Sequence, residues 1–208
     1  MIKKLGNRGI TAPNISNTCF LVLCGGAGTR MAGRDKPLMN WRGRPMVDHV
    51  LDSVPPNMLR WISANRNHQT YAQRARVLKD ASVLADPSIK PGPLVGILSG
   101  LRALNSEPRQ QWLLVSPGDT PQLDRQWWPT MQQNAEATQA PAVVAFDGTR
   151  QQHLHLLLHQ TLESHLLSYL KAGERSAYGW LDTLEVEQAT FTTASSFHNI
   201  NAPKDLSP

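Results

Sequence analysis

Residues 23–37 read Leu23-Cys24-Gly25-Gly26-Ala27-Gly28-Thr29-Arg30-Met31-Ala32-Gly33-Arg34-Asp35-Lys36-Pro37, and they are the most informative part of this chain. They follow a short apolar run, residues 19–23, that predicts a buried strand. The loop holds four glycines and three basic residues. Glycine has no Cβ, so backbone N–H groups can approach phosphate oxygens closely, and Arg30 and Lys36 add positive charge. The loop therefore favours a polyphosphate site over a flexible connection.

Two common phosphate-binding motifs do not fit this loop. A P-loop requires a Gly-Lys pair, and no glycine here is followed by lysine; a dinucleotide fingerprint fails because Met31 stands where a third glycine or alanine is needed. The pattern that remains, Gly-Gly-x-Gly-x-Arg-Met followed by Asp-Lys-Pro, resembles the signature loop of nucleotidyltransferases. In that superfamily the loop wraps a nucleoside triphosphate and the lysine contacts it.

The length and the net charge of the chain limit its domain organisation and its partners. With 208 residues, it is expected to form a single nucleotidyltransferase domain over residues 19–208, after a loosely ordered N-terminal extension at residues 1–18. No apolar run approaches the ~20 residues of a membrane span, and no secretory signal is evident, so we expect a cytoplasmic protein that binds no membrane. The net charge of +5 favours anionic partners. The sequence has no run of basic residues interleaved with aromatic ones, so we do not expect nucleic acid as a partner.

The two cysteines, Cys19 and Cys24, flank one predicted strand. On an extended segment they would point to opposite faces and lie too far apart for a disulfide. We expect both to be reduced thiols.

Alternating strand and helix patterns run through most of the chain. Repeated strand–helix–strand units predict an α/β fold, a Rossmann-like three-layer nucleotidyltransferase fold with a mostly parallel sheet. Predicted strands lie at residues 19–23, 59–64, 82–85, 111–115, 142–146, 153–159 and 184–191. Predicted helices lie at residues 45–54, 67–78, 94–104, 123–134 and 162–170.

Polar residues follow four of these strands. They are the glycine loop, Asn65-Arg66, Asp86 and Asp119. Ligands of open α/β sheets bind beyond the carboxyl ends of the strands, so these residues are expected to share one rim.

Asp119 is the candidate ligand for Mg²⁺, which takes one or two carboxylates and otherwise binds phosphate oxygens and water. Its Pro-Gly-Asp-Thr-Pro context also suits an ordinary turn aspartate. Asp86 could contact nucleotide or acceptor, or open a turn before Pro87. Asn65 could recognise base or ribose, or cap a helix.

Four histidines in the second half, His153, His155, His159 and His165, lack cysteine or carboxylate partners at useful spacing. They are interpreted as surface or half-buried residues rather than metal ligands. The pair at residues 127–128, two tryptophans, is interpreted as core packing at a helix start.

The motifs together resemble molybdenum cofactor guanylyltransferases, the family of molybdopterin-guanine dinucleotide biosynthesis protein A. The resemblance spans about residues 20–206. In chain order the matching segments are the loop at 23–37, Ala64-Asn65-Arg66, Asp86, Pro91-Gly92-Pro93-Leu94, Pro117-Gly118-Asp119-Thr120-Pro121, Tyr169-Leu170-Lys171-Ala172-Gly173-Glu174-Arg175 and Phe197-His198-Asn199-Ile200-Asn201-Ala202-Pro203.

This resemblance implies that GMP moves from GTP to molybdenum-molybdopterin with Mg²⁺, releasing pyrophosphate. It also implies site roles by position. Expected nucleotide contacts are Leu23, Cys24, Gly25, Gly26, Gly28, Lys36, Asn65, Asp86 and Asp119, with Arg30 and Lys36 neutralising charge, Asp119 holding the metal, and Asn199 and Asn201 on the acceptor side.

Three positions depart from the family pattern. Cys24 replaces a usual alanine, Ser63 replaces a nucleotide-contacting asparagine of some members, and Gln152-His153 replaces a polar residue followed by proline. The same transfer from CTP, or a non-catalytic protein that binds nucleotide or delivers the cofactor, remain alternatives. Transient contact with other enzymes of molybdenum cofactor synthesis is also expected.

Overall fold

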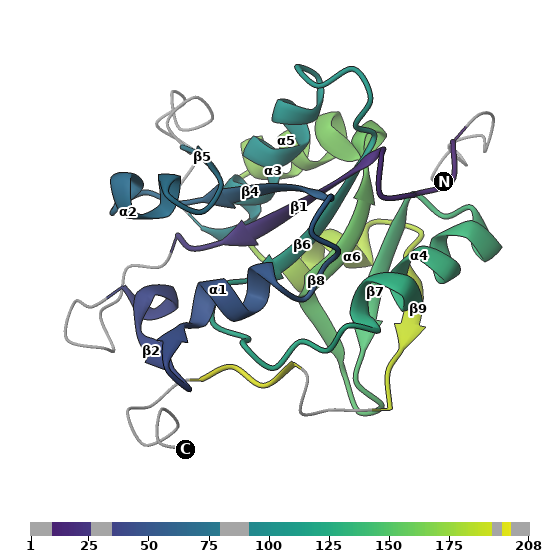
Figure 1. Cartoon of the computed structure of the whole chain (residues 1–208). Coiled ribbons are helices and arrows are strands. Elements are labelled where there is room, and N and C mark those ends of the chain that lie inside the picture. The colour runs from purple at the N-terminus through teal and green to yellow at the C-terminus, as the bar shows by residue number, and fades with distance from the viewer. Residues whose placement is uncertain (1–9, 26–34, 80–91, 193–196, 201–208) are drawn as a thin grey trace.

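The structure is a computed structural model, and it describes residues 10–25, 35–79, 92–192 and 197–200 (Figure 1). Strands and helices alternate along most of the chain. In order they are β1 (Thr18–Leu23), the 3-10 helix η2 (Lys36–Leu38), β2 (Asn40–Trp41), β3 (Arg44–Pro45), α1 (Met46–Leu51), β4 (Leu59–Ser63), α2 (His68–Ala72), β5 (Arg76–Leu78), α3 (Pro93–Leu104), β6 (Trp112–Pro117), α4 (Trp127–Thr138), β7 (Ala142–Phe146), β8 (Gln151–His159), the 3-10 helix η4 (Gln160–Leu162), α5 (Glu163–Lys171), α6 (Ala177–Asp182) and β9 (Glu187–Thr190).

The main sheet confirms the predicted α/β fold. Its seven strands follow the order β5-β4-β1-β6-β8-β7-β9. Neighbours in the first half, β5 through β6, all run parallel, and β9 is parallel to β7. Among the described strands of this main sheet, only β8 runs opposite to the rest, antiparallel to both β6 and β7. Because of this reversal, β8 begins at the rim where β1, β4 and β6 end.

Each face of the sheet is buried under its own set of helices. Phe20 and Val22 of β1 pack with α1 and α4, whereas Cys19 and Leu21 pack with α3, α5 and α6 (Figure 1). This alternation is the period of two that a buried strand imposes. Cys24 lies on the face opposite Cys19, and both thiols are free and buried, as expected from the sequence.

Helix α3 packs closely against the sheet at two glycines. A Cβ at Gly100 would be 2.7 Å from Leu21 Cδ2 and 2.8 Å from Leu113 Cδ2. Two residues with no side chain, Gly96 and Gly100, therefore allow this helix to approach the strands.

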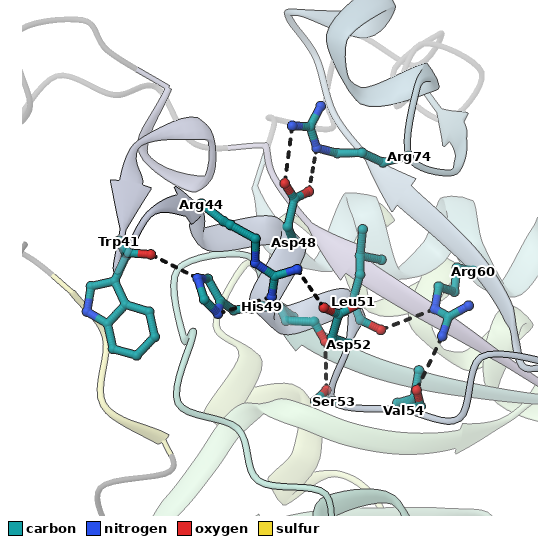
Figure 2. Close-up of polar contacts among 11 residues, drawn as sticks. Trp41, Arg44, Asp48, His49, Leu51, Asp52, Ser53, Val54, Arg60 and Arg74 are labelled. Carbon is teal, nitrogen blue, oxygen red and sulfur yellow. Dashed lines mark hydrogen bonds and ion pairs between the residues drawn. The ribbon is translucent and has the colours of Figure 1, made fainter.

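Polar contacts attach α1 to the elements around it (Figure 2). Asp48 on α1 accepts hydrogen bonds from Arg74, which follows α2, at 2.5 and 3.3 Å. Arg60 on β4 donates to the Leu51 carbonyl at the end of α1 and to the Val54 carbonyl in the turn that follows. The bond to Leu51 satisfies a carbonyl that the helix end leaves without an intrahelical partner. Helix α1 is thus bound both to β4 and to the residues that follow α2.

Part of the predicted N-terminal extension contacts the core. The Trp112 indole N–H donates to the Thr11 carbonyl at 2.8 Å, and Ile10 and Ile15 pack against the buried cluster around Phe20. Strand β1 begins at Thr18, one residue earlier than predicted.

Several sequence predictions were wrong in detail. The helix expected over residues 67–78 ends at Ala72, and residues 76–78 form β5, because Val77 pairs with Ile62 of β4 in the parallel sheet. The β2–β3 hairpin and α6 were not predicted. The strand expected at residues 82–85 lies outside the described residues. None of the helices in the described ranges is long and apolar enough to cross a membrane.

Candidate functional site

The centre of the candidate site is an ion pair between two residues 83 positions apart in the chain. Lys36 Nζ lies 2.6 Å from Asp119 Oδ2, and the two side chains are 17% and 20% exposed. Lys36 begins η2, and Asp119 follows β6. The expected convergence of the glycine-loop segment and the end of β6 is therefore present, and it forms a partly buried pair of opposite charges. Such a pair can exchange partners when an anion and a cation bind together.

Short backbone hydrogen bonds join the strand ends beneath this pair. Cys24 N donates to the Ser63 carbonyl at 2.8 Å, and Gly118 N donates to the Leu23 carbonyl at 2.9 Å. The carboxyl ends of β1, β4 and β6 are thus fixed against one another, as the rim of an open α/β sheet requires.

Gly118 is packed closely between the two loops. A Cβ there would lie 2.8 Å from Cys24 Sγ and 3.0 Å from the Pro37 ring. Cys24 is buried, and burial raises the pKa of its thiol well above the ordinary value. Its expected place at the nucleotide site is therefore that of a neutral packing group beneath the loop.

The side chain of Asn65 lies beside the start of the glycine loop. A Cβ at Gly25 would be 3.4 Å from Asn65 Nδ2. The N-cap of α2 is Asn67, not Asn65, so the helix-cap interpretation of Asn65 was wrong. Asn65 is exposed at the rim, where its amide could reach a ligand held by the loop.

A pocket of about 850 Å³ opens between the start of β8 and α6, next to the end of β6. Its wall includes Pro117, His153, Tyr178 and Asn199. Ile200 N donates to the Asp119 carbonyl at 3.1 Å, so the segment that carries Asn199 is attached to the Asp119 loop. The predicted acceptor-side residue Asn199 thus lines this pocket, and the residue after it is hydrogen-bonded to the backbone of Asp119.

Sequence reasoning missed two residues of this pocket, Arg150 and Tyr178. Tyr178 is 59% exposed, and its ring lies 5.3 Å from that of His153. Partial burial, followed by the positive charge of Arg150, lowers the pKa of His153. The departure Gln152-His153 was the one sequence signal that pointed to this wall.

Two of the four histidines were misjudged. His155 and His159 are buried rather than on the surface or half-buried, because β8 lies in the interior of the sheet. Burial lowers the pKa of His155 to about 3 and that of His159 to about 4. His155 Nε2 lies 3.3 Å from the Thr120 hydroxyl, which donates to the Pro117 carbonyl at 2.9 Å. His155 therefore supports the loop that carries Asp119. The tryptophan pair at the start of α4 is buried, as expected.

Part of the expected site lies outside the described residues, namely Gly26, Gly28, Arg30, Asp86 and Asn201. Within the described part of the chain, no three His, Cys, Asp or Glu side chains gather as a metal site. Mg²⁺ needs only one or two carboxylates when phosphate oxygens and water complete its shell. A single carboxylate, Asp119, beside a glycine-rich loop fits that requirement.

Comparisons with known proteins agree on one family. Residues 20–188 match the MobA-like NTP transferase domain. The chain is 39% identical over 167 residues to a molybdenum cofactor guanylyltransferase of Ectopseudomonas mendocina, covering 79% of this chain and 77% of that protein. It is 34% identical over 193 residues to the protein of the same name from Vibrio cholerae, covering 92% and 90%. The fold is shared with molybdopterin-guanine dinucleotide biosynthesis protein A of Archaeoglobus fulgidus, with a TM-score of 0.72 at 20% identity over 90% of this chain and 94% of that one.

Proposed function

The chain belongs to the MobA-like NTP transferase family, and we propose that it transfers GMP from GTP to the phosphate of molybdenum-molybdopterin. The products are molybdopterin guanine dinucleotide and pyrophosphate. Support comes from the name shared by its curated relatives, molybdenum cofactor guanylyltransferase. The observation that carries the chemistry is the 2.6 Å contact between Lys36 Nζ and Asp119 Oδ2 at the rim of the sheet.

The reaction requires little acid–base catalysis from the protein. An oxygen of the acceptor phosphate forms a bond to the α-phosphorus of GTP as the bond to the bridging oxygen of pyrophosphate breaks. The attacking oxygen is already anionic, so no general base is required. The protein must instead align the two substrates and neutralise the charge that collects on the phosphates.

Lys36 and Asp119 divide this work. With GTP in the loop, the Lys36 ammonium would pair with a phosphate oxygen and the Asp119 carboxylate would hold Mg²⁺. The ion would supply positive charge that offsets the charge of the phosphates. Arg30 adds a second positive group from the same loop. The rest of the nucleotide site comprises Leu23, Cys24, Gly25, Gly26, Gly28, Asn65 and Asp86.

The acceptor occupies the pocket that Asn199 lines, and Asn201 is assigned to the acceptor side from the sequence. The pocket volume of about 850 Å³ lies within the range of pockets that enclose small organic ligands. Its aromatic wall, Tyr178 on His153, suits a flat pterin ring, and Arg150 suits an anionic group. Pro117, which lines this pocket, precedes Asp119 by two residues, so the proposal has the acceptor phosphate enter from this side. The proposal includes a cytoplasmic location and transient contact with enzymes that supply the pterin or receive the product.

The test is a Mg²⁺-dependent pyrophosphate-release assay with molybdopterin and each of the four nucleoside triphosphates. We expect turnover with GTP, and a fall in kcat of about 10²- to 10³-fold in Asp119→Ala, on the order of removing one group that stabilises transition-state charge. Asp124→Ala is the matched control, because Asp124 is exposed and lies five residues further along the chain. Preference for CTP would overturn the guanylyl assignment. Full turnover by Asp119→Ala would overturn the metal assignment, and no turnover with any triphosphate would favour a non-catalytic binding protein.

A further inference from the structure

We propose that Asp35 is a positioning residue that aims Lys36 at Asp119 and couples it to the segment after β4. The inference rests on the proposed nucleotidyl transfer. The Asp35 carboxylate is almost completely enclosed, with a side chain 4% exposed, and its contacts are made through Oδ2, whereas the buried Oδ1 has no hydrogen-bond partner among the described residues. A buried carboxylate is costly unless donors surround it, so its partners indicate what it holds.

Those partners come from the residues that follow β4. Asn67 Nδ2 donates to Asp35 Oδ2 at 2.8 Å, and Arg66 Nε lies 3.5 Å from the same oxygen. The hydroxyl of Tyr71 is also beside this carboxylate. Burial raises the pKa of Tyr71, and the neighbouring Cys24 thiol and Asp35 carboxylate raise it further. One carboxylate thus lies beside three side chains of the segment that leads into α2, namely Arg66, Asn67 and Tyr71.

The segment that Asp35 binds is itself firmly held. Tyr71 is fully buried, and its backbone N–H donates to the Asn67 carbonyl at 3.1 Å. At the other end of α2, Arg74 is bound to Asp48 of α1 (Figure 2). Helix α2 therefore offers a fixed anchor, and Asp35 fastens the end of the glycine-loop segment to it.

The position of Asp35 determines that of Lys36 because a stiff turn of backbone connects them. Leu38 N donates to the Asp35 carbonyl and Met39 N donates to the Lys36 carbonyl, both at 3.0 Å. Pro37 has a fixed φ and is buried against Gly118. With Asp35 held and this turn closed, the Lys36 side chain starts from one defined place and points to Asp119.

Coupling to the nucleotide side follows from the same contacts. Arg66 and Asn67 directly follow Asn65, the residue expected to meet the base or ribose. A ligand that orders residues 65–67 also orders Asp35, and hence Lys36. Loss of the Asp35 carboxylate should therefore lower kcat for GTP more than it raises KM.

The test compares Asp35→Ala, Asp35→Asn and Asn67→Ala with the wild type in the pyrophosphate assay, with thermal unfolding measured in parallel. Misplacement of a reacting group by about 1 Å costs about 100-fold, so we expect kcat to fall about 10- to 100-fold in Asp35→Ala. Asp35→Asn keeps an oxygen for Asn67 and should retain an intermediate rate. Asp52→Ala, which breaks an exposed ion pair with Arg44, is the control and should keep the wild-type rate.

The decisive measurement is a double-mutant cycle with Lys36→Ala. If Asp35 acts through Lys36, then Asp35→Ala causes little further loss in the Lys36→Ala background. Equal loss of kcat in both backgrounds would overturn the inference, because it would mean a general structural role. Should Asp35→Ala fail to fold, Asp35→Asn and Asn67→Ala complete the same cycle, and wild-type rates in both would also overturn it. A wild-type protein without turnover would refute the proposed function instead.

Discussion

Replacing Gly118 by alanine tests how closely the ends of β1 and β6 must pack for Lys36 to meet Asp119. The added Cβ would lie 2.8 Å from Cys24 Sγ, where ordinary contacts begin at 3.4 Å, so about 0.6 Å of movement is required. The Pro37 ring, at 3.0 Å, blocks a second direction.

Little of the surroundings can yield without moving the site. Cys24 and Gly118 are both held by backbone hydrogen bonds, to Ser63 and Leu23, and a proline ring is stiff. The displacement therefore passes to Asp119, the next residue, or to Lys36, the residue before Pro37. Because a shift near 1 Å costs about 100-fold, we expect kcat to fall roughly 10- to 100-fold. Overpacking should also lower the free energy of unfolding by about 1–3 kcal/mol.

Two assays on one set of variants measure these effects, namely pyrophosphate release and urea unfolding. The double variant Cys24→Ala with Gly118→Ala removes the closest clash and should regain part of the lost rate, whereas Cys24→Ala alone should stay near the wild-type rate. A Gly118→Ala protein with wild-type kcat and stability would refute the reasoning, since it would show that the loops separate without disturbing Lys36 and Asp119.

Two further predictions concern stability. Burial lowers the pKa of His155 to about 3 and of His159 to about 4, so the unfolded chain, with histidine pKa values near 6.5, binds more protons below that pH. As the pH is lowered from 6.5 to 4, the free energy of unfolding should therefore fall by up to about 1.4 kcal/mol per pH unit for each histidine. Urea titrations of His155→Gln and His159→Gln should show a shallower dependence of this free energy on pH. An unchanged dependence on pH would contradict the prediction. The second prediction concerns Gly100→Ala, which places a Cβ 2.7 Å from Leu21 Cδ2. It should lower the free energy of unfolding by about 1–3 kcal/mol and leave the KM for GTP unchanged. An unchanged free energy of unfolding would show that α3 can move away from the sheet.

Local patterns in the sequence predicted β1, β4 and β6, the strands whose ends form the rim. The apolar run before the glycine loop, the Pro-Gly-Asp-Thr-Pro turn and the topological rule for strand ends together predicted that Lys36 and Asp119 share a rim. Residues 76–78 were misread, because a three-residue edge strand carries too few positions to show its period of two. Its identity comes from pairing with β4, which is a long-range contact.

The acceptor side was less accessible to sequence reasoning. Tyr178 lies on a six-residue helix whose pattern is too short to recognise, and its proximity to His153 depends on β8 running antiparallel. The interior position of β8 in the sheet buries His155, which the sequence had indicated to be on the surface or half-buried. The contact of Asp35 with Asn67 joins residues 32 positions apart and has no local signature.

The reversed strand β8 also has a consequence for synthesis of the chain. Strands β1, β4, β5 and β6 all lie before Gly118, so this parallel group can assemble while the remainder is still on the ribosome. One edge of β6, which carries Trp112 and Leu114, then stays unpaired until residues 151–159 have been synthesised and can form β8. An apolar strand with an open edge is a template for association with other chains. A nascent or truncated chain that ends before residue 151 is therefore expected to need chaperone protection, and the full-length chain is not.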